Sequence, residues 1–298
     1  MTEATLNYLM CPDATGGHRM AYWQWGDEQS SHVVVCVHGL TRQGRDFDTL
    51  AQALCRQATT PIRVVCPDVA GRGQSDWLQD PTGYQIPAYA ADMLVLLTHL
   101  RPTTLDWVGT SMGGVIGLIL CGQPDLPLPV PIRRLVLNDV GPVMQWQALQ
   151  RIGEYLGQTG KFASLQEAAD ALWTTSSSFG PHTPAQWLAL SAPMVKPMPA
   201  CPAYLTLRYD PAIALPFRQV TPESAAQGEA MLWQLYDNIK AATLLIRGAQ
   251  SDLLTLETAQ AMTQRGPRAR LLQFDGVGHA PTLVADDQVQ AVTSFLLA

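Results

Sequence analysis

Short runs of apolar residues recur along the chain, separated by longer stretches with a different pattern. The runs contain few polar residues and no strict alternation: Val33–Val37, Arg63–Cys66, Leu105–Val108, Arg134–Leu137, Thr243–Ile246 and Arg270–Phe274. Strands of a parallel sheet have this pattern because helices bury both of its faces. The segment His18–Trp25 alternates instead, which predicts an antiparallel strand at the sheet edge.

Between these runs the apolar residues follow the period of an α-helix. Two such helix faces are Phe47, Leu50, Ala51, Leu54 and Ala58, and Tyr89, Met93, Leu96, Leu97 and Leu100. Alternating strands and helices predict an α/β fold with a doubly wound, mostly parallel sheet. In such folds ligands bind beyond the carboxyl ends of the strands.

The alternation stops between residues 142 and 238. This stretch predicts four helices, at Gln145–Leu156, Leu165–Thr174, Pro184–Ala192 and Pro222–Asp237. The segment Met194–Pro202 carries three prolines and is predicted to be a stiff, irregular loop. We therefore expect a core formed by residues 1–141 and 239–298, with residues 142–238 inserted as a helical lid.

Composition narrows the class of protein. Of the 298 residues, 47% are hydrophobic and 15% are charged, which suits a globular core and argues against disorder or a coiled coil. The net charge is −6 and the largest basic cluster is Arg133-Arg134, so no nucleic-acid partner is expected. The six cysteines are scattered and predict small buried side chains.

The chain also has no obvious membrane signal. Its most apolar segment, Val115–Cys121, is much shorter than the roughly 18 residues of a membrane span. The first residues carry neither the basic nor the apolar region of a signal peptide, so a cytoplasmic location is expected.

The strongest chemical signal is a G-x-S-x-G motif. Gly109-Thr110-Ser111-Met112-Gly113 stands between a predicted strand and the helical run Val115–Cys121. A sharp turn at this place requires glycine on either side of the serine and raises the serine hydroxyl above the sheet. Ser111 is therefore predicted to be a nucleophile.

A serine hydroxyl needs a histidine base and a carboxylate that orients it. His279 follows the last predicted strand in a glycine-rich loop and is the predicted base, whereas His38 suits an oxyanion loop better. Two carboxylates follow strands: Asp252 is the predicted acid, and Asp139 is the competing candidate. The order Ser111, Asp252, His279 is that of a nucleophile-elbow hydrolase.

Four motifs in order give the whole chain a resemblance to the α/β-hydrolase superfamily, in its lidded, serine esterase-like branch. They are His38-Gly39-Leu40, Asp68-Val69-Ala70-Gly71-Arg72-Gly73-Gln74-Ser75, the Ser111 elbow and Gly278-His279. The resemblance implies an oxyanion hole formed by the backbone N–H groups of Leu40 and Met112. We assign the second motif a structural role, with hydrogen bonds that tie its tight turn.

These features together predict a carboxylesterase that cleaves small esters through an acyl-enzyme and needs no metal or organic cofactor. Arg42, Met144 and Trp146 are candidate substrate contacts, Arg42 for a substrate carboxylate. A hydrolase of lactones or carbon–carbon bonds from aromatic-compound catabolism is the alternative enzyme. A ligand-binding protein without catalysis is the alternative from another class. The expected partner is a small ester, and association into a homo-oligomer is left open.

Overall fold

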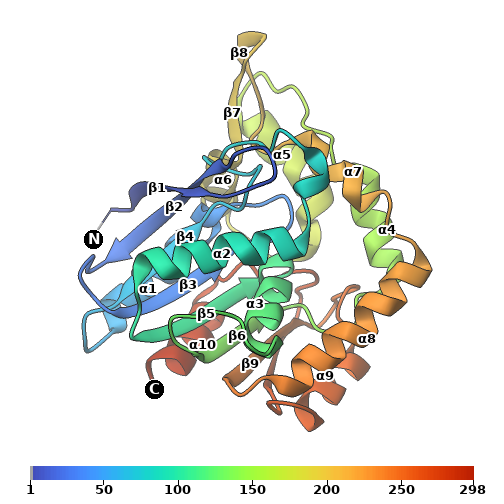
Figure 1. Ribbon diagram of the computed structural model, residues 1–298. Helices are drawn as coiled ribbons and strands as arrows, with labels where there is room; N and C mark the ends of the chain where they lie inside the picture. Colours follow the sequence, from blue (N-terminus) through green and yellow to red (C-terminus); the bar gives the residue numbers. More distant parts are fainter. Residues whose placement is uncertain (1–2) are drawn as a thin grey trace.

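The computed structural model describes residues 3–298, so the first two residues of the N-terminal segment lie outside it. Its centre is an eight-stranded sheet with the order β1-β2-β4-β3-β5-β6-β9-β10 (Figure 1). The strands are β1 (Thr5–Cys11), β2 (His18–Gly26), β3 (His32–Val37), β4 (Arg63–Pro67), β5 (Thr104–Thr110), β6 (Ile132–Asn138), β9 (Ala242–Gly248) and β10 (Arg270–Phe274).

The strands at one side of the sheet are antiparallel and the others are parallel. β2 pairs antiparallel with both β1 and β4. The sequence predicted β2 as an antiparallel edge strand; it is antiparallel, but β1 lies outside it and forms the edge. From β4 to β10 all neighbouring strands are parallel. The predicted mostly parallel α/β sheet is therefore confirmed.

Apolar side chains cover both faces of the central strands. In β3, Val33 and Val35 join one hydrophobic cluster, while Val34 and Cys36 join a second cluster on the opposite face. Successive side chains of a strand point to opposite faces, so a strand buried on both sides needs an unbroken apolar run.

Helices form a layer on each face of the sheet (Figure 1). Helices α1 (Asp48–Gln57) and α10 (Asp286–Leu297) bury residues in one cluster. Helices α2 (Ile86–Leu100), α3 (Met112–Gly122) and α9 (Leu256–Gln264) bury residues in the other. The apolar faces predicted for α1 and α2 are the faces that pack on the sheet. No helix among residues 3–298 is both long enough and apolar enough to cross a membrane.

The segment between β6 and β9 adds no strand to this sheet. Its helices are α4 (Trp146–Tyr155), α5 (Leu165–Ser176), α6 (Pro184–Ser191), α7 (Ala214–Phe217) and α8 (Pro222–Asn238). Four of the five were predicted, with bounds within two residues. Side-chain caps explain the agreement, because Thr183 and Thr221 each form a capping box directly before a proline that begins its helix.

One prediction for this segment is wrong. Val195–Met198 (β7) and Cys201–Leu207 (β8) form an antiparallel hairpin, where the prolines had predicted an irregular loop. Proline is tolerated in a two-stranded ribbon because each strand is an edge strand. Backbone N–H groups on its outer side have no partner strand, so the N–H group that proline lacks is not needed there. A bridge between Phe162 and Leu205 ties the hairpin to the chain just before α5.

Candidate active site

The G-x-S-x-G motif forms a sharp turn between β5 and α3. Ser111 has φ 50° and ψ −114°, a strained conformation outside the common backbone regions. A Cβ atom on Gly113 would lie 2.0 Å from the backbone oxygen of Val37, and one on Gly109 would lie 2.2 Å from that of Gly113. Both glycines are therefore required by close backbone approach, as the motif predicted.

Ser111 and His279 meet at the carboxyl ends of the strands. The Nε2 atom of His279 lies 3.0 Å from Oγ of Ser111, although the two residues are 168 positions apart. A neutral imidazole at this distance can accept the hydroxyl proton. The structure thus brings together the serine and the histidine that the sequence singled out.

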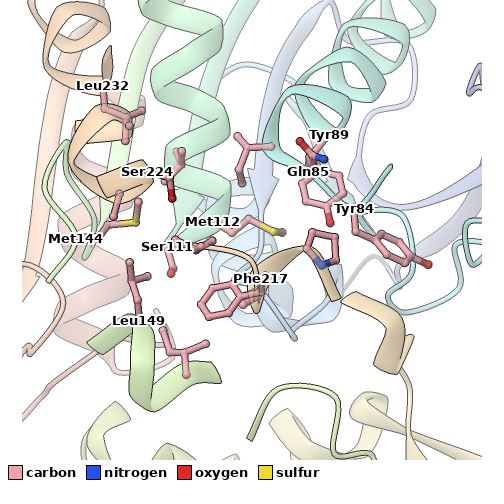
Figure 2. Close-up of a pocket in the computed structure, with 18 of the residues that line it drawn as sticks. Tyr84, Gln85, Tyr89, Ser111, Met112, Met144, Leu149, Phe217, Ser224 and Leu232 are labelled. Carbon is pink, nitrogen blue, oxygen red and sulfur yellow. The ribbon is translucent and has the colours of Figure 1, made fainter. Parts of the chain in front are cut away.

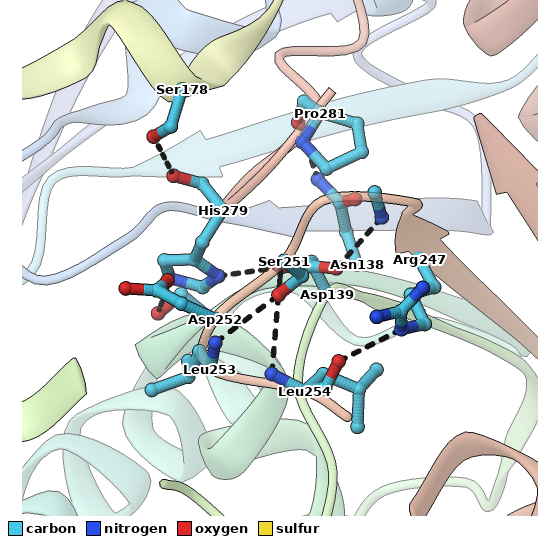
Figure 3. A network of polar contacts seen from close by, with 12 residues as sticks. Asn138, Asp139, Ser178, Arg247, Ser251, Asp252, Leu253, Leu254, His279 and Pro281 are labelled. Carbon is cyan, nitrogen blue, oxygen red and sulfur yellow. Dashed lines mark hydrogen bonds and ion pairs between the residues drawn. The ribbon is translucent and has the colours of Figure 1, made fainter. Parts of the chain in front are cut away.

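The carboxylate beside His279 is Asp139, directly after β6, and not Asp252. Oδ2 of Asp139 lies 2.7 Å from Nδ1 of His279 (Figure 3). Asp139 is fully buried and also accepts hydrogen bonds from the N–H of Gly248 at 2.8 Å and the hydroxyl of Ser251 at 2.6 Å. These donors fix the carboxylate in the orientation that can hold the imidazole.

Asp252 points away from this network. It is paired with Arg151 of α4, with 2.8 Å between Oδ2 and Nε, and its side chain is 48% exposed. The side chain of the preceding residue, Ser251, points towards the network instead, and its hydroxyl donates a hydrogen bond to Asp139. The sequence prediction of Asp252 as the partner of His279 is therefore corrected to Asp139. Both carboxylates follow a strand, and only the path of the loop after β9 decides which one turns inward.

The amides expected to form an oxyanion hole flank the nucleophile. Met112 is the first residue of α3, and Leu40 stands in the loop after β3; both residues line a cavity with Ser111. No hydrogen-bond acceptor for either backbone N–H is found within residues 3–298. Free amides near a helix N-terminus suit a developing negative charge.

Buried polar side chains hold the Leu40 loop in place. Nε of Arg72 donates to the carbonyl oxygen of Leu40 at 2.8 Å, and the guanidinium is fully buried. His38 donates from Nδ1 to the carbonyl oxygen of Gly39 and accepts the N–H of Val69 at Nε2. Burial lowers the pKa of His38 to about 3, so its imidazole stays neutral. The structural role predicted for the second motif agrees with these contacts.

Two cavities meet at Ser111. The larger has a volume of about 610 Å³ and is mainly apolar, with Met112, Met144 and Phe217 on its walls (Figure 2). The smaller has a volume of about 340 Å³ and is lined by His279 and Arg42, among others.

The predicted substrate contacts divide between these cavities. Met144 lines the larger cavity and Arg42 lines the smaller one. Trp146, at the start of α4, lines neither cavity among the described residues. The sequence did not reveal the contributions of Phe217 and Arg151, because residues between β6 and β9 reach the site only through tertiary packing.

One cluster of potential metal ligands lies outside this site. Cys11, His18 and Asp92 are buried with their ligand atoms within 4.8 Å of one another. Both ring nitrogens of His18 are already engaged, with Asp92 and Asp13, each at 3.1 Å. The cluster is thus explained by a histidine held between two carboxylates.

A serine at a strained elbow, hydrogen-bonded to a histidine that is held by a buried carboxylate, defines a serine hydrolase on an α/β sheet. The sequence model described as "Alpha/beta hydrolase family" matches residues 34–292. The chain therefore belongs to the α/β-hydrolase family, as its four motifs predicted, and it is an enzyme of the serine ester hydrolase class.

Two relatives extend over nearly the whole chain. A 3-hydroxybutyrate-oligomer hydrolase from Cupriavidus necator is 48% identical over 291 residues, covering 97% of each chain. The crystal structure of an alpha/beta hydrolase from Novosphingobium aromaticivorans has a TM-score of 0.84 and 33% identity, covering 99% of each chain.

Proposed function

We propose that this ester hydrolase acts on short oligomers of 3-hydroxybutyrate or on closely related small esters of hydroxy acids. The observation that carries the proposal is the hydrogen-bonded chain from Asp139 through His279 to Ser111, placed where two cavities meet. The substrate class is supported by the 48% identity to the Cupriavidus necator oligomer hydrolase. Cavities of about 610 and 340 Å³ also suit small substrates.

Each residue has one role in the reaction. Ser111 Oγ attacks the ester carbonyl carbon while Nε2 of His279 takes the hydroxyl proton, and Asp139 stabilises the imidazolium that forms. The oxyanion is bound by the N–H groups of Leu40 and Met112. The carbon–oxygen bond to the alcohol then breaks, and His279 returns the proton to the leaving alkoxide.

Water completes the reaction. His279 takes a proton from a water molecule, whose oxygen attacks the acyl-enzyme, and the proton passes back to Ser111 Oγ as the ester bond to the enzyme breaks. One ester and one water give one carboxylic acid and one alcohol, so the reaction needs no redox partner.

Residues 142–238 serve as the lid in this proposal. Leu149 of α4, Phe217 of α7 and Leu232 of α8 all line the larger cavity. Helix α8 packs closely on the core, because a Cβ on Gly122 of α3 would lie 2.0 Å from the backbone oxygen of Leu235. The lid therefore determines substrate size through the walls it supplies. Cytoplasmic location and oligomeric state stay predictions.

The test compares substrate classes on the purified protein. Rates are measured with p-nitrophenyl esters from acetate to dodecanoate, with the dimer and trimer of 3-hydroxybutyrate, with an enol-lactone and with a vinylogous diketone acid. We expect turnover of short esters and of the oligomers, and no turnover by Ser111→Ala. Turnover of the lactone or diketone alone would instead support the catabolic hydrolase, and inactivity on every substrate would favour a ligand-binding protein.

A further inference from the structure

The smaller cavity has an unusual polar wall. Arg42 lines it and is 9% exposed, with Nε and Nη2 donating to the Asp46 carboxylate at 2.7 and 2.6 Å. Nη2 also donates to the carbonyl oxygen of Leu190 at 3.2 Å. The remaining nitrogen, Nη1, is buried without a hydrogen-bond partner among the described residues. A buried charged donor without an acceptor is costly, and the residue that carries this one is part of the cavity wall.

A second arginine stands on the same cavity. Arg151 of α4 lines it and is 39% exposed, with Nε and Nη2 on the Asp252 carboxylate at 2.8 and 3.0 Å. The two arginines are each balanced by one carboxylate. They therefore offer directed N–H donors to an acidic ligand rather than a strong net positive field.

The position of His279 identifies which part of an ester this cavity receives. His279 lines the smaller cavity, whereas the larger one is lined by Ser111 and Met112 without it. The base that takes the Ser111 proton must return it to the alcohol oxygen that leaves, so the alcohol portion lies on the His279 side. The acyl portion then occupies the larger, apolar cavity.

In an oligomer of 3-hydroxybutyrate, the free carboxylate belongs to the alcohol portion of the terminal ester bond. We propose that the smaller cavity binds this carboxylate through Arg42, supported by Arg151, so that the enzyme removes hydroxybutyrate units from the carboxyl end. This inference rests on the function proposed above. It adds a direction of cleavage and a requirement for a free acid.

The spacing suits a single terminal unit. A Cβ placed on Gly39 would lie 3.8 Å from Cγ of Arg42 and 3.8 Å from Cβ of Ser111, so the stem of the Arg42 side chain begins close to the nucleophile. One hydroxybutyrate unit has only three carbon atoms between its ester oxygen and its carboxylate oxygens. With the terminal carboxylate held at Arg42, the first product is the monomer.

The experiment compares two trimers of 3-hydroxybutyrate, one with a free carboxylate and one capped as an N-methyl amide. The cap removes the charge and leaves every ester bond in place. Because hydrogen bonds to charged groups contribute about 1.5–3 kcal/mol, kcat/KM should be about ten- to a hundredfold higher for the free acid, mainly through KM. Equal kcat/KM values for the two trimers would overturn the proposal.

Three variants locate the effect. Arg42→Lys keeps a positive charge but loses the guanidinium fork, and Arg151→Gln removes the charge of the second donor; both should reduce the preference for the free acid. Arg265→Gln is the matched control, since Arg265 forms a similar exposed pair with Asp237 and lines neither cavity. Its preference should equal that of the wild type. An unchanged preference in both cavity variants would exclude these arginines.

Product analysis tests the direction separately. With a tetramer labelled at its hydroxyl end, unlabelled monomer and labelled trimer should appear first. Labelled monomer as the first product would show cleavage from the opposite end and refute the assignment of the cavities. Failure of the proposed function would look different, because p-nitrophenyl butyrate and all the oligomers would then remain uncleaved.

Discussion

Replacing Asp139 by asparagine tests which carboxylate the active site uses. The carboxylate of Asp139 accepts hydrogen bonds from Gly248 at 2.8 Å, Ser251 at 2.6 Å and His279 at 2.7 Å, in a fully buried position. Asparagine has the same shape but only one acceptor oxygen, and its NH₂ group must then face one of these donors.

The effect of Asp139→Asn on activity depends on which tautomer His279 adopts beside the asparagine amide. If the NH₂ group faces Nδ1, the ring must accept there and carry its proton on Nε2, where it can no longer take the Ser111 proton. In a serine protease this wrong tautomer lowers kcat by about 10⁴, and we expect a loss of that order for Asp139→Asn. The unpaired buried donor should also lower the free energy of unfolding by about 1–3 kcal/mol.

Asp252→Asn is the matched substitution at the carboxylate that the sequence favoured. In its ion pair with Arg151, the Arg151 side chain is 39% exposed and the Asp252 side chain is 48% exposed. Such exposed pairs contribute about 1 kcal/mol or less to the free energy of unfolding. We expect kcat/KM for p-nitrophenyl butyrate to stay within about fivefold of the wild type. Urea unfolding of both variants separates lost activity from lost structure. A collapse of kcat in Asp252→Asn, with Asp139→Asn nearly unaffected, would refute this assignment.

Two further predictions concern stability. Gly113→Ala places a Cβ 2.0 Å from the backbone oxygen of Val37 and should destabilise the protein by about 3 kcal/mol or more. Gly228→Ala in α8 meets no atom within 4 Å and should stabilise the protein by about 0.5–1 kcal/mol. Urea unfolding measures both free energies, and equal changes in the two variants would contradict the reasoning. The pKa of His38 falls from 6.5 to about 3 on folding. The contribution of neutral His38 to the free energy of unfolding is therefore complete above pH 6.5. It is lost as the pH falls towards 3, which lowers that free energy by up to about 5 kcal/mol. Unfolding of the wild type and His38→Gln between pH 7 and 4 should show a steeper loss for the wild type, and parallel curves would count against a neutral buried His38.

The proposed nucleophile and base could be predicted from the sequence because their signals are local. The turn around Ser111 needs glycine at two fixed positions, and His279 stands in a glycine-rich loop after a strand. The parallel sheet could also be predicted from the sequence, because strands buried on both faces need apolar runs such as Val33–Val37. Each of these signals depends on the backbone needs of a few neighbouring residues.

Other features depend on contacts between distant parts of the chain. Asp139 and Asp252 both follow strands, and the loop after β9 turned Ser251 inward and Asp252 outward to Arg151. The β7–β8 hairpin likewise forms where the prolines predicted an irregular loop, because both of its strands are edge strands and edge strands tolerate proline.

The sequence by itself thus determined the sheet and identified the proposed nucleophile and base. Only the tertiary structure decided which carboxylate contacts His279 and which side chains line the two cavities. The reason is physical: backbone requirements act over a few residues, whereas the direction of a loop side chain and the shape of a cavity are set by packing between segments such as α4, α7 and the strand ends.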